Sequence, residues 1–458
     1  MPSKTLHILF RNLAIAALSV IYYWIGYEIE RSQFVILFTL YSSAFGLSFY
    51  LYKSGISLKS LIGLSFLYKL IFLFAVPELS QDFYRFIWDG MLNVKGYNPY
   101  LHLPIDLIRL DFIKDQSFNR LLYEKMGNLN ASNYSTYPPI AQLLYSFSYA
   151  ISGNDLMQNI IVLRLVNIIA EAGLTVFGLK ILSHLKRPKS QILFFILNPL
   201  VILESTFSLH FEVVMLFFLV LSLYYLYRSK IYMSALGLTG AVVSKMLPLM
   251  FLPLLFPYFN KKSNSFNRHQ ILNYLKYTVV SALGIILFYV VFWNSDLIVK
   301  SSKTLSLYFS SFEFNAGLYY ILRWIGFKWS GYNMIDVIGT GLSVLSLIFI
   351  LFLSLKHKRI EFQKLINYML FASTAYYLFS TTIHPWYIML PLLLSVFTRY
   401  NYMLIWSWLV FLSYSAYKME GFQENYWLLA VEYVILVSFV SCEVLLKKKL
   451  FTNRESLG

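Results

Sequence analysis

Residues 80–104 of this chain carry charged side chains at a spacing suited to acid–base chemistry. Asp82, Arg85 and Asp89 are three and four residues apart, so on a helix they share one face. A carboxylate can take the proton of an attacking hydroxyl group, and an arginine can bind a carboxylate or phosphate through two parallel hydrogen bonds. A structural interpretation stays open, in which Arg85 only pairs with the two aspartates and each pair contributes about 0.2–0.5 kcal/mol.

Aromatic and apolar residues cover the other faces of this predicted helix. Their pattern predicts an amphipathic helix at the membrane surface, with the rings of Tyr84 and Trp88 at the level of the lipid headgroups. Gly90, Gly96 and Asn98-Pro99 predict that the helix ends there and that the chain turns.

Five more ionisable residues lie in or beside apolar runs and are candidates for the same site: Glu204, His210, Glu212, Lys245 and His384. Charged groups at such depth usually face a cavity or one another. Structural interpretations remain open here too. Glu204 could form a buried pair with Lys245. His210 and Glu212 could cap the end of a span, and His384 could be an ordinary loop residue before a proline.

The rest of the chain is strongly apolar, with 58% hydrophobic and 13% charged residues among 458. Long apolar runs recur, and about 20 such residues cross the roughly 30 Å of hydrocarbon in a bilayer as a helix. We therefore predict an all-α, polytopic membrane protein of roughly 11–14 helices, some of them short and re-entrant. The net charge of +16 lies mostly in short loops beside apolar runs, which is typical of cytoplasmic loops and not of nucleic-acid binding.

Placing the basic loops in the cytoplasm orients the chain. Predicted spans at 13–27, 34–52 and 61–76 put the long polar segment 77–137 outside, and 294–332 forms a second outer segment. The apolar stretch after Tyr137 begins with two prolines and is too short to cross comfortably, so we expect a re-entrant helix. Both termini are then cytoplasmic, and residues 1–458 form one transmembrane catalytic domain.

Three charged residues fall inside predicted spans. We expect Lys69 to extend its amine to the membrane surface, and Arg164 and Glu171, two turns apart, to face the bundle interior. No metal site is expected, because the seven histidines are scattered, there is no H-E-x-x-H motif, and Asp82 and Asp89 are too far apart for a compact D-x-D.

Five blocks resemble the membrane-embedded GT-C glycosyltransferases, in particular the bacterial branch of mannosyltransferases that uses polyprenyl-phosphate sugars. They are QDFYRFIWDGMLNVKGYNPY (81–100), YPPIAQLLY (137–145), NPLVILESTFSLHFE (198–212), SKMLPLMFLPLL (244–255) and HPWYIMLPLL (384–393). The chain differs from the family in having three predicted spans before the first large outer loop. It also has Glu212 where relatives often have aspartate.

The resemblance implies an inverting transferase in the bacterial inner membrane. It would move a hexose, with mannose expected, from a polyprenyl-phosphate donor to a lipid or glycan hydroxyl on the extracytoplasmic side. The family's catalytic base maps onto Asp82, with Asp89 as second candidate. The candidates for binding the substrate and the donor phosphate are Arg85, Tyr84, Trp88, Asn98, Tyr137, Glu204, His210, Glu212, Lys245, His384, Trp386 and Tyr387.

Chemistry agrees with this assignment. A departing alkyl phosphate gains negative charge, for which Arg85, Lys245 and His384 are the candidate cations, so we expect no cofactor and no divalent metal. Aromatic residues such as Trp88 and Trp386 could stack on sugars or mark the interface. A transporter or lipid flippase is the alternative function, although no internal repeat is visible. A polysaccharide polymerase or ligase is a further alternative.

Overall fold

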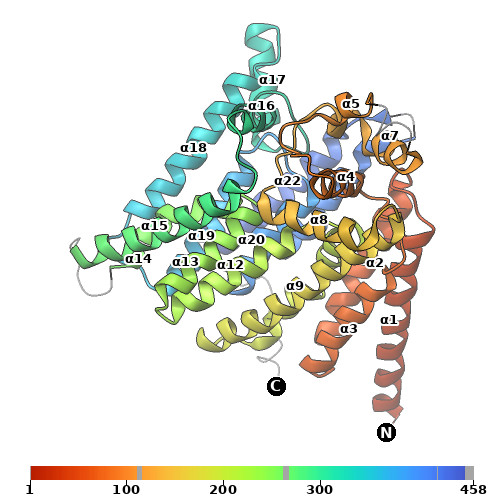
Figure 1. The fold of residues 1–458 in the computed structure, drawn as a ribbon. Coiled ribbons are helices and arrows are strands. Elements are labelled where there is room, and N and C mark those ends of the chain that lie inside the picture. The colour runs from red at the N-terminus through yellow and green to blue at the C-terminus, as the bar shows by residue number, and fades with distance from the viewer. Residues whose placement is uncertain (1, 111–115, 261–267, 420, 449–458) are drawn as a thin grey trace. The chain divides into compact units, whose positions relative to one another are not determined.

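The computed structural model describes residues 2–110, 116–260, 268–419 and 421–448. The described chain is almost entirely helical, as predicted (Figure 1). Its short strands β1 (Tyr417–Lys418) and β2 (Gly421–Phe422) pair antiparallel. The chain divides into two compact units. Unit 1 comprises residues 1–79, 167–210 and 384–458, and unit 2 comprises residues 80–166 and 211–383.

Helix α9 (Leu156–His184) contributes residues to both units. The other helices of unit 1 are α1 (Pro2–Tyr27), α2 (Phe34–Lys53), α3 (Leu58–Ile71), η1 (Lys189–Ile192), α10 (Leu193–Ile196), α11 (Pro199–Val201), η2 (Ile202–Phe207), η4 (Pro385–Ile388), α20 (Met389–Val396), α21 (Tyr402–Leu409), η5 (Val410–Ala416), α22 (Tyr426–Val440) and η6 (Ser441–Leu445).

The helices of unit 2 are α4 (Asp82–Val94), α5 (Pro104–Leu107), α7 (Ser117–Ala131), α8 (Pro139–Ser152), α12 (Glu212–Tyr227), α13 (Ile231–Ser244), η3 (Leu247–Phe251), α14 (Leu252–Tyr258), α15 (Arg268–Val290), α16 (Leu297–Ser310), α17 (Leu318–Ser330), α18 (Ile335–Leu355) and α19 (Phe362–Leu378).

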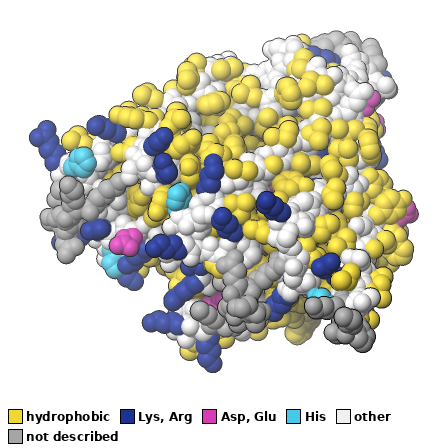
Figure 2. All heavy atoms as spheres, turned by 90° about the horizontal axis from the view of Figure 1, so that it is seen from below, with side chains coloured by type: hydrophobic (Ala, Val, Ile, Leu, Met, Phe, Trp, Pro, Cys, Tyr) yellow, Lys and Arg dark blue, Asp and Glu magenta, His cyan; other side chains and the backbone are white. Residues whose placement is uncertain are grey.

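Several helices are long and apolar enough to cross a membrane, which confirms the predicted polytopic class. Within the described ranges there are six of them, or seven if the pair 189–196 and 199–207, bent by 49°, counts as one span. The six are Thr5–Tyr27, Phe34–Lys53, Leu156–His184, Arg268–Val290, Ile335–Leu355 and Tyr426–Leu445. Shorter apolar helices accompany them. Figure 2 shows one face of the molecule, where lysine and arginine side chains lie among hydrophobic ones and acidic side chains are few.

The core of unit 1 contains an ion pair that the sequence did not reveal. Lys69 on α3 and Glu171 on α9 are both fully buried, with Nζ 2.9 Å from Oε1. The Lys69 amine also donates to the carbonyl of Ile196 at 2.9 Å. The prediction that Lys69 extends to the membrane surface is therefore wrong, because acceptors within the unit satisfy its charge. Glu171 is fully buried as predicted, and so is Arg164.

In unit 2, helix α4 packs against α8 and α7 (Figure 1). The helix does not end at Gly90, as the sequence suggested, but continues to Val94. Gly90 instead permits close packing, because a Cβ there would lie 2.3 Å from the carbonyl oxygen of Tyr145 on α8. The positive φ of Gly96 (+81°) accompanies the turn that follows the helix.

Candidate active site

Asp89 lies in the middle of a buried hydrogen-bond network in unit 2. Its Oδ1 accepts from Arg85 Nε at 2.7 Å. Its Oδ2 accepts from the Ser135 hydroxyl at 2.6 Å and from Gln142 Nε2 at 2.9 Å. The Asp89 side chain is 0% exposed. Donors therefore bind both oxygens, and the structural pairing of Arg85 with Asp89 that the spacing allowed is present.

Arg85 ties α4 to the segment that ends α7. Its Nη1 donates to the carbonyl of Asn133 at 2.9 Å and to the carbonyl of Asn130. The side chain is only 3% exposed. Three acceptors on two segments thus fix the guanidinium, which in turn fixes Oδ1 of Asp89.

Asp82 is the first residue of the same helix and has a different environment. It is half-buried, and its Oδ1 accepts from Asn130 Nδ2 at 3.2 Å. Its backbone amide donates to the Ser80 hydroxyl at 3.2 Å. The N-terminus of a helix favours a negative charge, so this position suits an ionised carboxylate.

Lys245 and Glu212 form an ion pair in unit 2. Lys245 follows α13 in an extended conformation (φ −159°, ψ 129°), and Glu212 is the first residue of α12. The Lys245 side chain is 34% exposed and that of Glu212 only 3%. Burial lowers the pKa of Lys245, whereas the negative charge of Asp82 acts in the opposite direction, so the amine lies within electrostatic reach of Asp82.

Glu204 has partners other than those expected from the sequence. In unit 1 its Oε2 lies 3.1 Å from His210 Nδ1, and its Oε1 accepts from the Tyr414 hydroxyl at 2.7 Å. The open interpretation in which Glu204 pairs with Lys245 is not borne out, because Lys245 binds Glu212. The π-helical turn η2 contains Glu204, and the backbone amide of His210 donates to the Glu204 carbonyl at 2.9 Å, which brings the two side chains together.

Aromatic rings continue from His210 in unit 1. The ring of Trp386 stacks on His210 at 3.5 Å and on His384 at 4.4 Å between centroids. The Tyr387 ring meets His384 edge-on at 5.3 Å. The structure therefore joins Glu204, His210, Trp386 and His384, all predicted site residues, in one cluster, which we call the histidine–tryptophan stack.

Other predicted site residues hold unit 2 together. Trp88 is fully buried and does not lie in the headgroup layer as expected. Asn98 Nδ2 donates to the carbonyl of Phe292 at 2.8 Å. The carbonyl of Tyr137 accepts from the Tyr100 hydroxyl at 2.6 Å. Tyr84 is half-buried, and its ring lies against Phe83 with 4.0 Å between the centroids.

Sequence reasoning missed several residues that contact the predicted ones, among them Asn130, Ser135, Gln142 and Tyr414. Gln142 carried a usable signal, since it is a polar residue inside an otherwise apolar helix. The other three lie in segments where polar or aromatic residues are common. Among the described residues, no group of three or more His, Cys, Asp or Glu side chains is arranged to hold a metal ion.

Comparison with known proteins identifies the family. Residues 2–260 match a family described as alpha-(1→6)-mannopyranosyltransferase, N-terminal domain, which is more than half of the 458 residues. No curated protein matches the chain, and no solved structure does. The matched region includes Asp82, Asp89, Glu212 and Lys245. The chain therefore belongs to the alpha-(1→6)-mannopyranosyltransferases, a family of polyprenyl-phosphate-mannose-dependent GT-C membrane enzymes.

Proposed function

We propose that this enzyme transfers mannose from a polyprenyl-phosphate donor to a glycan or glycolipid hydroxyl on the extracytoplasmic side of the membrane, with inversion. Asp82 takes the acceptor proton as the oxygen attacks the anomeric carbon. The bond between that carbon and the phosphate oxygen breaks, and the lipid phosphate leaves with the electron pair. The negative charge of a nearby carboxylate stabilises a transition state with oxocarbenium character.

The contrast between the two aspartates of α4 carries this proposal. A general base needs an oxygen that can approach the acceptor hydroxyl. Asp89 is fully buried, and three donors occupy its two oxygens. Asp82 is half-buried at the start of the helix. The assignment of Asp82 as the base and Asp89 as a positioning residue follows from this difference.

Lys245 is the best-supported cation for the departing phosphate. Its amine is partly exposed, and the charge of Asp82 acts on it. Arg85 is less suited, because Asp89 and two carbonyls already engage it. Fixed charge near a leaving phosphate lowers the barrier without any metal.

The histidine–tryptophan stack of unit 1 stays a predicted part of the donor site. The His210 ring lies beside the Glu204 carboxylate and against Trp386, which offers a π-system to a sugar or a cation. We propose that His384 contacts the donor phosphate or sugar. The outward orientation rests on the distribution of basic loops in the sequence.

The test is mannose transfer from radiolabelled polyprenyl-phosphate mannose in membranes that contain the Asp82→Asn variant. We expect a loss of about 10²- to 10⁴-fold, the usual contribution of a positioned base. Asp106→Asn is the matched control, since Asp106 is an exposed aspartate of the same segment. Unchanged transfer by Asp82→Asn at equal protein level would remove Asp82 from the mechanism.

A further inference from the structure

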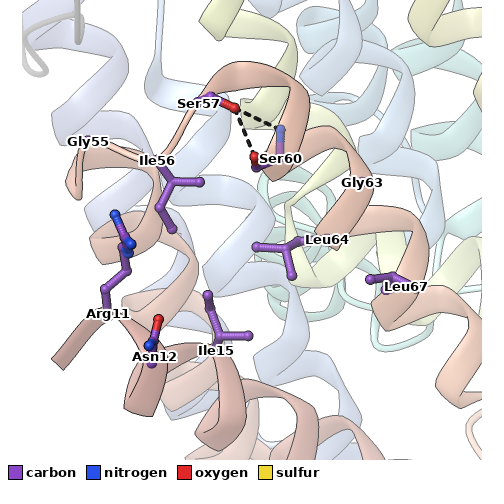
Figure 3. A pocket seen from close by; sticks show the side chains of 10 residues that line it. All are labelled: Arg11, Asn12, Ile15, Gly55, Ile56, Ser57, Ser60, Gly63, Leu64 and Leu67. Carbon is purple, nitrogen blue, oxygen red and sulfur yellow. Dashed lines mark hydrogen bonds between the residues drawn. The ribbon is translucent and has the colours of Figure 1, made fainter. Parts of the chain in front are cut away.

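A groove in unit 1, remote in sequence from the proposed base, has the shape and chemistry of a lipid site. Its volume is about 490 Å³. It lies between α1 and residues 55–67, which lead into α3 and form most of that helix (Figure 3). The lining residues are Arg11, Asn12, Ile15, Gly55, Ile56, Ser57, Ser60, Gly63, Leu64 and Leu67.

Both polar and apolar side chains line this groove. Ser57 and Ser60 lie where α3 begins, Leu64 and Leu67 lie further along it, and Arg11, Asn12 and Ile15 face them from α1 (Figure 3). Leu67 is 58% exposed, as expected of a side chain that contacts lipid. The combination of a cation, polar groups and apolar side chains suits an amphiphile with a charged headgroup and an acyl chain.

Arg11 supplies charge for a headgroup. It has no ion pair or side-chain hydrogen bond with any residue in the described ranges, and neither has Asn12. None of the ten lining residues is acidic. A half-buried arginine without a protein partner is available to an anion, and a phosphate suits its fork of donors.

The serine hydroxyls at the start of α3 add hydrogen bonding to the groove. The Ser57 and Ser60 hydroxyls are 2.8 Å apart, and Ser57 Oγ also accepts from the Ser60 amide at 3.1 Å. Only one hydroxyl proton is used between the two oxygens. The other remains available to a phosphate oxygen.

We propose that this groove binds an anionic glycerophospholipid of the surrounding bilayer, with the phosphodiester on Arg11 and an acyl chain along Leu64 and Leu67. A basic pocket between membrane helices is a recurring site for anionic headgroups. The occupant is a bilayer lipid, and the site is separate from the transfer reaction.

Native mass spectrometry of the purified full chain tests this, with phosphatidylglycerol and phosphatidylcholine added separately. We expect phosphatidylglycerol to bind more tightly. Arg11→Gln should weaken its binding about fivefold, the factor expected for one basic residue at an anionic surface. Lys53→Gln is the charge-matched control, because exposed Lys53 lies on α2 and does not line the groove.

A second variant fills the groove without changing charge. A Cβ at Gly63 would meet nothing within 4 Å, so Gly63→Leu should project into the groove and weaken phosphatidylglycerol binding. Gly46→Leu on α2, where a Cβ also meets nothing within 4 Å, is its control. A third titration uses polyprenyl phosphate. Equal binding of the two phospholipids, full binding by both variants, or tighter binding of polyprenyl phosphate than of phosphatidylglycerol would each overturn the proposal.

Discussion

Helix α4 places its two aspartates in opposite environments. At the start of the helix, Asp82 is half-buried, and its Oδ1 accepts from the neutral side-chain amide of Asn130 at 3.2 Å. Two turns later, Asp89 is fully buried between Arg85, Ser135 and Gln142. Asp89, surrounded by fixed donors, can only position its neighbours, whereas Asp82, at an accessible helix start, can take up and release a proton. One short helix therefore holds both a structural carboxylate and the proposed catalytic one.

The two lysine–glutamate pairs differ in the same way. Lys69 and Glu171 in unit 1 are both fully buried. Lys245 in unit 2 remains 34% exposed although its partner Glu212 is buried. Removing one partner of a buried pair leaves an uncompensated charge, so both residues are needed for stability. The partly exposed amine of Lys245 can still contact an anionic substrate group.

Replacing Asp89 with asparagine should destabilise the protein most. The variant leaves the buried Arg85 charge without its carboxylate, which costs about 3–5 kcal/mol. Chemical unfolding of the purified protein in detergent measures the loss, with Asp106→Asn as control. If the stability of Asp89→Asn matches that of Asp106→Asn, the supporting role of Asp89 is wrong.

Removing a single donor from Asp89 should have a smaller effect. Gln142→Leu deletes the 2.9 Å hydrogen bond to Oδ2 and should cost about 1.5–3 kcal/mol, the value for a hydrogen bond to a charged group. The same unfolding measurement applies. Gln158→Leu is a suitable control, since that residue is a helical glutamine outside the network. Equal losses in the two variants would show that the contact to Asp89 contributes nothing specific.

The smallest effect is expected at the start of α4, where Asn130 contacts Asp82. Asn130→Ala removes a neutral donor from Asp82 and should cost about 0.5–1.5 kcal/mol, or roughly a tenfold change in transfer at most. Transfer rate and unfolding are measured on the same preparation. A loss of transfer as large as that of Asp82→Asn would mean that Asn130 takes part directly and does not only orient the carboxylate.

The sequence was sufficient to predict the membrane class, a helix that carries Asp82, Arg85 and Asp89, and the short helix that begins at the Pro138-Pro139 pair. Apolar periodicity and the position of prolines are local signals, so they can be read from the sequence alone. Gly90 was misread as the end of a helix, because only the neighbouring backbone of Tyr145 shows that the glycine permits close packing.

The partners of charged residues were harder to predict. Lys69 was expected to extend to the membrane surface, and only the packing of α3 and α9 brings Glu171, which is far along the chain, within 2.9 Å. A pairing of Glu204 with Lys245 was left open, and its actual partners, His210 and Tyr414, could not be told from the sequence. Ser135 escaped notice because its role depends on Asp89, which lies on another segment.

The most direct test of the division between the two aspartates is a single-turnover measurement of mannose transfer by Asp82→Asn, with unfolding measured alongside. We predict that the chemical step slows by about 10²- to 10⁴-fold while the free energy of unfolding stays close to that of the unmodified enzyme. An unchanged chemical step, or a loss of rate that only follows a loss of folded protein, would contradict the assignment of Asp82 as the base.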